Sequence, residues 1–223
     1  MQLPYYKAYD LRYRQVHAEG LRWFADEPTA LVREVLHRFH ITKDMPILEI
    51  GCGEGRDAIP LLCEGYSLLA TDVSEEAVRY VSARTEHADA VRVFDALTDK
   101  LDKDFAFIYA VAVLHMLVED ADRAAFYRTI RTHLREDGLS LVCSMGDGRT
   151  EQCTDPSRAF EPQQRVHEAT GRTLTIASTT CRMATTDILI AEAEAAGLRV
   201  IECGTCRIDP DYATVTYLLL KKA

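Results

Sequence analysis

The 223-residue sequence contains no apolar run long enough to form a helix that crosses a bilayer. Its opening stretch, MQLPYYKAYDLRYRQ, is aromatic and charged and has no apolar core of the kind that marks a secretion signal. Internal repeats and low-complexity tracts are also missing, which excludes a repeat architecture. These absences predict a single domain over residues 1–223, located in the cytoplasm and without a membrane partner.

Positive charge is scarce as well, with 26 Lys and Arg against 35 Asp and Glu and a net charge of −9. An acidic surface repels a phosphate backbone, so no nucleic acid partner is expected. Seven cysteines are an odd number, in a chain large enough to bury a core without disulfides, and they indicate reduced thiols. Cys203 and Cys206 form a C-x-x-C, but no second pair stands at ligand spacing. We therefore predict no metal site, and we expect Cys203 in a core strand.

Apolar and amphipathic segments alternate along the chain. This alternation predicts a doubly wound α/β fold, a parallel sheet with helices on both faces. Strands are expected at 47–50, 66–72, 90–95, 104–114, 139–145, 198–206 and 213–222, and helices within 26–40, 56–65, 74–84, 120–136 and 185–197, with Thr29 and Ser74 as N-caps. The last two strands have no helix between them and should pair as an antiparallel hairpin. An aromatic N-terminal arm (1–28) and a polar, lid-like excursion (146–172) stand outside this pattern.

The stretch ILEIGCGEG, residues 47–55, places three glycines in five positions directly after a short apolar strand. Glycine is unfavourable in an ordered backbone, so the cluster indicates that the backbone closely approaches a ligand. In an open α/β sheet, ligands bind at the carboxyl ends of the strands. Dinucleotide enzymes use G-x-G-x-x-G, whereas Gly51, Gly53 and Gly55 make G-x-G-x-G. The carboxylate of Glu49 would disfavour a bound pyrophosphate and favour a cation.

Acids also end the second and third predicted strands. Asp72 can accept hydrogen bonds from both hydroxyls of a ribose, although it could also be an N-cap, a role for which Ser74 is better suited. Asp95, followed by Ala96, is placed to bind the amine and a ring nitrogen of adenine, unless it is an ordinary loop acid. Together with the glycine cluster, these positions predict a receptor for a cationic adenosine compound.

At these positions the chain resembles the class I S-adenosylmethionine-dependent methyltransferases. EIGCGEG is similar to their first motif, TD at 71–72 to their ribose motif and FDA at 94–96 to their adenine motif, while VAVLHML and LREDGLSLV look like their fourth- and fifth-strand blocks. The resemblance implies a Rossmann-like seven-stranded sheet of order 3-2-1-4-5-7-6, with strand 7 antiparallel, and S-adenosyl-L-methionine as cofactor. The cofactor-binding residues that it implies are Glu49, Gly51, Cys52, Gly53, Gly55, Asp72, Val73, Asp95, Ala96 and Ala110.

The segment GEGRDAIPLLCEGYSLLATDVSEEAV also resembles the tellurite-resistance and thiopurine-type branch, which acts on small molecules and carries an arginine after the glycines. A small-molecule acceptor is therefore expected, methylated by in-line displacement at the sulfonium methyl, with S-adenosyl-L-homocysteine as the product. Two other functions stay open. One is a non-catalytic protein that binds an adenosyl ligand or a partner, and the other is a nucleotide-dependent oxidoreductase, against which the glycine spacing argues.

Several candidate side chains allow two interpretations. His115 could accept a proton or line the acceptor pocket, and it could equally be a packed histidine at a helix start. Tyr9, Tyr13 and Trp23 suit an aromatic cover over a sulfonium or acceptor, but they also suit packing of the arm on the sheet. Glu49 either contacts the methionine amine or orients the glycine loop. A hydroxyl acceptor would need a base, with His115 as the candidate, whereas a thiolate, amine or metalloid would not.

Overall fold

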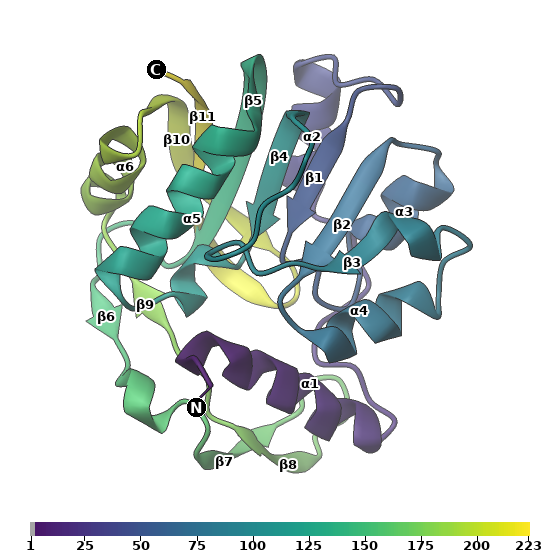
Figure 1. The fold of residues 1–223 in the computed structure, drawn as a ribbon. Helices are drawn as coiled ribbons and strands as arrows, with labels where there is room; N and C mark the ends of the chain where they lie inside the picture. The colour runs from purple at the N-terminus through teal and green to yellow at the C-terminus, as the bar shows by residue number, and fades with distance from the viewer. Residues whose placement is uncertain (1–2) are drawn as a thin grey trace.

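Seven strands form the central sheet of the computed structural model, which describes residues 3–223 (Figure 1). Their order is β10-β11-β5-β4-β1-β2-β3, and β11 runs antiparallel to both of its neighbours. Counted along the chain within this sheet, the order is 3-2-1-4-5-7-6, which confirms the predicted topology. The strands are β1 (Ile47–Ile50), β2 (Leu68–Asp72), β3 (Val91–Val93), β4 (Phe105–Val111), β5 (Leu134–Met145), β10 (Leu198–Ile208) and β11 (Tyr212–Lys222).

Helices cover both faces of the sheet, and this explains why its central strands are continuous apolar runs. Leu48 and Ile108 belong to a core shared with α5 and α6. The alternate residues Ile47 and Phe107 belong to a second core on the opposite face, shared with α2, α3 and α4. The helices are α2 (Ala30–Arg38), α3 (Ala58–Cys63), α4 (Glu75–Ser82), α5 (Asp120–His133) and α6 (Thr186–Ala195).

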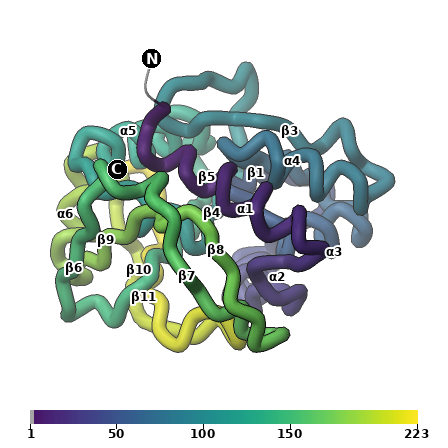
Figure 2. The backbone as a smooth tube through the Cα atoms, turned by 90° about the horizontal axis from the view of Figure 1, so that it is seen from below, coloured from purple at the N-terminus to yellow at the C-terminus, as the bar shows by residue number. Residues whose placement is uncertain are grey.

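A cap closes the carboxyl edge of the sheet, below it in Figure 1. It consists of α1 (Ala8–Ala18) and of the hairpin formed by β7 (Pro162–Val166) and β8 (Thr173–Ala177), and Figure 2 shows these elements side by side. Arg12 joins the two parts, because its buried guanidinium donates to the carbonyl oxygens of Ala177 and Ser178 at 2.6 to 3.1 Å. The arm and the excursion, far apart in sequence, therefore form one cap.

The excursion after β5 is ordered and runs beyond residue 172. Besides the cap hairpin it contains β6 (Gln152–Cys153), which pairs with β9 (Arg182–Met183) before the chain enters α6. The lid-like segment is thus built from two small antiparallel sheets. The first two residues of the predicted arm lie outside the described part of the chain.

The predicted end of the helix over 120–136, which corresponds to α5, was wrong. The helix ends at His133 instead of 136, and the next residues begin β5. Leu134 has extended backbone angles (φ −78°, ψ 136°), is fully buried, and pairs with Phe105 of β4. The sequence pattern after His133 would allow the helix to continue, but burial of Leu134 in the sheet ends it there.

Two other local predictions need correction, and one is confirmed. Thr29 stands at the N-cap of α2, but its hydroxyl makes no cap bond and donates to Asp57 at 2.8 Å. Cys203 is exposed, because β10 is the edge strand and its alternate residues face solvent. Ser74 does cap α4, since its hydroxyl oxygen accepts from the N–H of Ala77 at 3.1 Å.

All seven cysteines are free. Within residues 3–223, no group of three His, Cys, Asp or Glu side chains is arranged to hold a metal ion. The helices in this part of the chain are all too short or too polar to span a membrane.

Candidate active site

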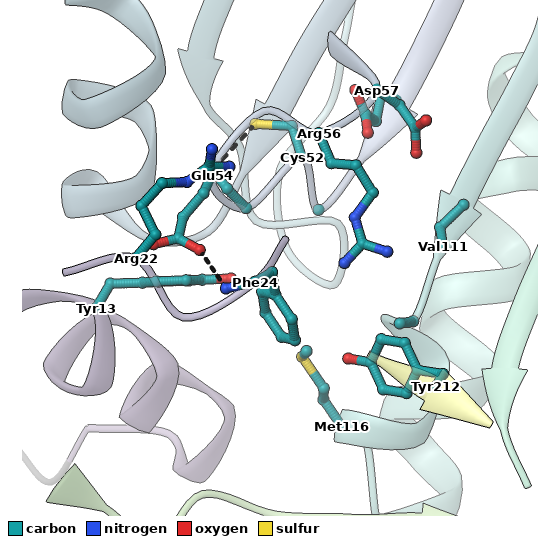
Figure 3. A pocket seen from close by; sticks show the side chains of 14 residues that line it. Tyr13, Arg22, Phe24, Cys52, Glu54, Arg56, Asp57, Val111, Met116 and Tyr212 are labelled. Atoms are coloured by element: carbon teal, nitrogen blue, oxygen red, sulfur yellow. Dashed lines mark hydrogen bonds between the residues drawn. The ribbon is translucent and has the colours of Figure 1, made fainter. Parts of the chain in front are cut away.

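A small cavity lies between the cap and the carboxyl ends of β1 and β4 (Figure 3). It encloses about 50 Å³, whereas ligand pockets usually measure roughly 300 Å³ or more. Its walls include the glycine-rich turn (residues 51–55), Tyr13 and Phe24 of the arm, and Tyr212 of β11. The cavity is therefore smaller than a nucleoside-sized ligand.

The glycine-rich turn requires glycine for both its conformation and its surroundings. Gly51, Gly53 and Gly55 have φ angles of 77°, 51° and 83°, in the left-handed region. A Cβ atom on Gly51 would lie 2.3 Å from Cγ2 of Val113, and one on Gly53 would lie 2.8 Å from the hydroxyl oxygen of Tyr13. The turn thus lies with its backbone against the segment after β4 on one side and against the cap on the other.

Buried carboxyl groups gather at and beside the cavity. Glu49, Glu54 and Asp57 are each 3% exposed, and Asp72 is 8% exposed. Burial and then the charge of Asp57 raise the pKa of Glu49 well above its ordinary value. Its Oε2 atom has no hydrogen-bond partner of good geometry within residues 3–223, although the Tyr109 hydroxyl interacts with the carboxyl group and opposes the rise of its pKa. A cation bound beside Glu49 would offset both penalties, so this site suits a positively charged ligand.

Asp72 organises the turn in addition to ending β2. Its two carboxylate oxygens accept hydrogen bonds from the backbone N–H groups of Gly53 and Ser74, both at 2.8 Å. Burial raises the pKa of Asp72 to about 6, against the opposing effect of these bonds. Cys52 is buried in the same turn, and Val73 is half-buried directly after Asp72. Each carboxylate oxygen keeps acceptor capacity, so the ribose role of Asp72 stays a prediction.

The predicted adenine position lies under the arm. Asp95 accepts a hydrogen bond from the Tyr6 hydroxyl at 3.1 Å and lies 3.6 Å from Nζ of Lys7. The carbonyl oxygen of Ala96 accepts from the hydroxyl of Thr129 at 2.6 Å. Neither Tyr6 nor Lys7 was indicated by the sequence beyond their place in an aromatic arm. The adenine role of Asp95 and Ala96 stays a prediction.

Of the predicted cofactor residues, Glu49, Gly51, Cys52 and Gly53 line the cavity, whereas Gly55, Asp72, Val73, Asp95, Ala96 and Ala110 do not. Ala110 is fully buried in the core that α5 and α6 share with the sheet. The next two residues, Val111 and Ala112, line the cavity. A cofactor contact at Ala110 would therefore have to use its backbone.

His115 lies beside the cavity, adjacent in sequence to the cavity-lining Met116. It is 3% exposed, and its ring centroid lies 6.0 Å from that of Tyr212. Burial, followed by the charges of Arg123 and Arg12, lowers its pKa to about 3. The imidazole is therefore neutral at pH 7, and its Nδ1 atom finds no hydrogen-bond partner in the described residues.

The three predicted pocket aromatics divide into two roles. Tyr13 lines the cavity next to the glycine-rich turn. Tyr9 and Trp23 instead pack around Arg12, whose guanidinium carbon lies 5.2 Å from the centroid of each ring. For these two residues the structure favours the packing alternative.

A set of contacts that the sequence did not indicate fastens the arm to the glycine-rich turn. The Glu54 carboxylate accepts from the N–H groups of Trp23 at 2.9 Å and Phe24 at 2.8 Å, and it lies 2.9 Å from Nε2 of His17. Nδ1 of His17 lies 2.6 Å from the Glu76 carboxylate of α4. The position of Glu54 inside the glycine motif was the one sequence feature that could have pointed to its role. No sequence feature points to His17, because its partners come from two distant elements.

Arg56 and Tyr212 also line the cavity and were assigned no role from the sequence. Arg56 directly follows the glycines, a position that only the resemblance to the tellurite-resistance and thiopurine-type branch singles out. Tyr212 begins the last strand, and no local pattern connects it to a turn near residue 50.

Known proteins resemble this chain in sequence over about half of its length. Residues 47–138 match a family model described as a methyltransferase domain. Hemagglutinin 1 of Eikenella corrodens is 31% identical over 113 residues, which cover 49% of this chain and 37% of that protein. The probable S-adenosyl-L-methionine-dependent methyltransferase TehB of Haemophilus influenzae is 22% identical over 118 residues, which cover 51% of this chain and 41% of that protein. The match thus spans less than half the length of these relatives.

Solved structures resemble the chain over nearly its whole length. The CcbJ methyltransferase from Streptomyces caelestis has a TM-score of 0.70 and 18% identity, covering 96% of this chain and 99% of that one. The Burkholderia thailandensis 1,6-didemethyltoxoflavin-N1-methyltransferase, with bound 1,6-didemethyltoxoflavin and S-adenosylhomocysteine, has a TM-score of 0.69 and 17% identity, covering 100% and 92%. At these identities the likeness shows the fold.

Proposed function

Because the chain carries a class I S-adenosylmethionine-dependent methyltransferase domain, we propose that it transfers the methyl group of S-adenosylmethionine to a small-molecule acceptor. The observation that carries this proposal is the buried Glu49, whose Oε2 has no partner in residues 3–223, beside the glycine-rich turn. A pyrophosphate would be repelled there. A cofactor that carries an ammonium and a sulfonium would compensate the charge instead.

The bound cofactor supplies a methyl group on a sulfonium, an intrinsically reactive donor. The protein then has to align the acceptor with that methyl group and exclude water. Asp72 fixes the backbone of the glycine-rich turn through Gly53, which sets one side of the site. Arg12 ties α1 to the hairpin of the cap, so both parts close over the site together.

The environment of His115 bears on the chemistry of the acceptor. A general base works best with a pKa near the working pH, and burial lowers the pKa of His115 to about 3. His115 is therefore a weak base. We favour an acceptor that needs little deprotonation, such as an amine or a thiol that ionises readily, over an unactivated hydroxyl.

A small acceptor also agrees with the closed cap and the acidic net charge of −9. The structurally similar Burkholderia thailandensis enzyme was solved with bound 1,6-didemethyltoxoflavin and S-adenosylhomocysteine. A cytoplasmic location and the absence of nucleic acid and membrane partners stay predictions from the sequence.

Calorimetric titration followed by a turnover assay tests the proposal. S-adenosylmethionine and S-adenosylhomocysteine are expected to bind, and NAD is not. Methyl release from labelled S-adenosylmethionine is then measured over a panel of amines, thiols and alcohols. Binding of NAD without binding of adenosyl ligands would refute the proposal. Tight S-adenosylhomocysteine binding without turnover on any acceptor class would point to a non-catalytic binding protein.

A further inference from the structure

The loop after β4 (residues 112–118) forms part of the cavity wall. Ala112 and Met116 line the cavity, and Met116 is among the side chains labelled in Figure 3. Val113 packs so closely on the glycine-rich turn that a Cβ atom on Gly51 would lie 2.3 Å from its Cγ2. Ala112 begins the loop with a φ angle of 57°, in the left-handed region. A residue with a Cβ atom is unfavourable there, and the conformation persists only where surrounding contacts hold it.

A buried arginine of α5 holds both ends of the single 3-10 turn in this loop, Leu114–Met116. Arg123 is fully buried, and its Nη1 donates to the carbonyl oxygens of Leu114 at 3.0 Å and Leu117 at 3.2 Å. Its Nε and Nη2 donate to the Glu192 carboxylate of α6, both at 2.7 Å. This bidentate pair fixes the plane of the guanidinium. Nη1 is thereby directed at the loop.

Three other side chains hold the same loop, also through its main chain. The Thr180 hydroxyl donates to the carbonyl oxygen of Met116 at 2.6 Å, and Nη1 of Arg182 donates to that of Val118 at 2.9 Å. The Tyr5 hydroxyl oxygen accepts from the N–H of Val118 at 3.0 Å. These three side chains belong to the arm and the excursion. The contacts of α5 come from the core helices, so they do not depend on the arm or the excursion.

We propose that Arg123 is a positioning residue for methyl transfer. Through its bonds to the main chain it keeps His115 and Met116 in place against the bound acceptor, although it touches neither the acceptor nor the cofactor itself. This inference rests on the proposed function, in which the cofactor lies on the glycine-rich turn and the loop after β4 borders the acceptor. A misplacement of about 1 Å at the reacting atoms can lower a rate about a hundredfold.

The test removes the bonds to the loop without leaving a charge buried. Changing Arg123 alone would strand the Glu192 carboxylate in the core, which is strongly destabilising. The double variant Arg123→Met/Glu192→Met replaces the ion pair by apolar side chains of similar volume, an exchange that is often neutral for stability. Arg128→Met, at an exposed arginine of the same helix, is the matched control.

Three measurements are made on each protein. Calorimetry with S-adenosylhomocysteine is expected to give an unchanged affinity in the double variant. Methyl transfer, measured with the acceptor of highest rate among the amines, thiols and alcohols, is expected to show a kcat lowered about tenfold to a hundredfold. The third measurement is the NMR spectrum of the protein labelled with 13C at its methionine methyl groups. The signal of Met116, one of five methionines, is assigned from Met116→Leu and is expected to shift or broaden in the double variant alone.

Two results would overturn the proposal. An affinity for S-adenosylhomocysteine that falls as far as turnover would show that Arg123 supports the whole site. Unchanged turnover with an unchanged Met116 signal, in a folded double variant, would make the ion pair with Glu192 purely structural. If the double variant does not fold by thermal melting, Arg123→Lys carries the same comparison, since it keeps the charge and loses the fork. Wild-type protein that methylates no acceptor would instead contradict the proposed function, and with it the role of Arg123, even if the Met116 signal moves.

Discussion

Glu49 and Asp72 are both buried acids of the site, but their different surroundings suit them to different roles. Glu49 is buried with Oε2 unpartnered within residues 3–223, and burial together with the charge of Asp57 raises its pKa well above the ordinary value. Asp72 is buried too, but both of its oxygens accept backbone N–H groups. Glu49 is therefore suited to a cation, and Asp72 first of all to fixing the glycine-rich turn.

Asp72→Ala tests whether Asp72 fixes the glycine-rich turn. The change leaves the N–H groups of Gly53 and Ser74 without their acceptor, which is expected to cost about 1–3 kcal/mol of stability. S-adenosylhomocysteine affinity should fall by about tenfold to a hundredfold, because the turn loses the acceptor of its backbone N–H groups and the predicted ribose acceptor is removed. Thermal melting and calorimetry measure the two effects. Glu75→Ala, at an exposed acid in the first turn of α4, is the control. Full affinity in a folded Asp72→Ala protein would limit Asp72 to a structural role.

His17 makes the attachment of the arm depend on pH. Its ring lies between the carboxylates of Glu54 and Glu76 and stacks on Tyr80 with centroids 4.3 Å apart. Burial alone would lower the pKa of His17, but the hydrogen bonds to Glu54 and Glu76 outweigh burial and raise it above 6.5. The stability that His17 contributes is therefore fully present below pH 6.5, its unfolded value, and is lost as the pH rises through the folded pKa.

His17→Gln should consequently lower the melting temperature more at about pH 6 than at about pH 9. His37→Gln, at an exposed position of α2, should show no such dependence. Melting curves of the three proteins at both pH values provide the measurement. Equal shifts at the two pH values would mean that His17 stabilises the arm by packing alone.

At the scale of elements, the cap depends on contacts between segments from opposite ends of the chain. α1 packs on β8, and Arg12 supplies the hydrogen bonds between them from a position that is 6% exposed. A side chain of this kind stabilises the cap only while both elements are in place. The cap is therefore expected to open as a unit.

Arg12→Met is expected to loosen the cap without unfolding the sheet. Hydrogen exchange in residues 162–177 should accelerate about tenfold or more, while exchange in β4 should not change. Arg14→Met, at a side chain that is 56% exposed on the same helix, serves as the control. Methyl transfer should fall further than cofactor affinity, because water exclusion is lost first. Uniform acceleration across the sheet would show that Arg12 supports the whole fold rather than the cap.

At the scale of the molecule, the cofactor should join the sheet to the cap. A ligand that binds only the folded state stabilises it by about 2.7 kcal/mol at a hundredfold excess over its Kd. For a chain of 223 residues, this corresponds to a rise in melting temperature of roughly 5 to 10 °C. S-adenosylhomocysteine should produce this shift, and NAD at the same concentration should not. The reverse result would contradict the assignment of the glycine-rich turn to an adenosyl ligand.

The sequence by itself determined the strands of the sheet and the glycine-rich turn. Buried parallel strands need continuous apolar runs, and a backbone with positive φ needs glycine, so β1, β2 and the turn at Gly51 and Gly53 could be predicted locally. The order of the strands could be predicted only from the resemblance to the methyltransferase family. The helix end at His133 could not be predicted, because burial of the next residue in the sheet decides it.

Only the tertiary structure decided how the site is closed and which of its charges are paired. His17 meets Glu54 and Glu76, and Arg56 meets Asp211, through contacts between residues that no local pattern relates. Glu49 was recognisable as an acid before the glycines, but its lack of a partner is a property of everything packed around it in residues 3–223. Local sequence fixes backbone conformation, whereas burial and charge pairing depend on which distant segments fold against each other.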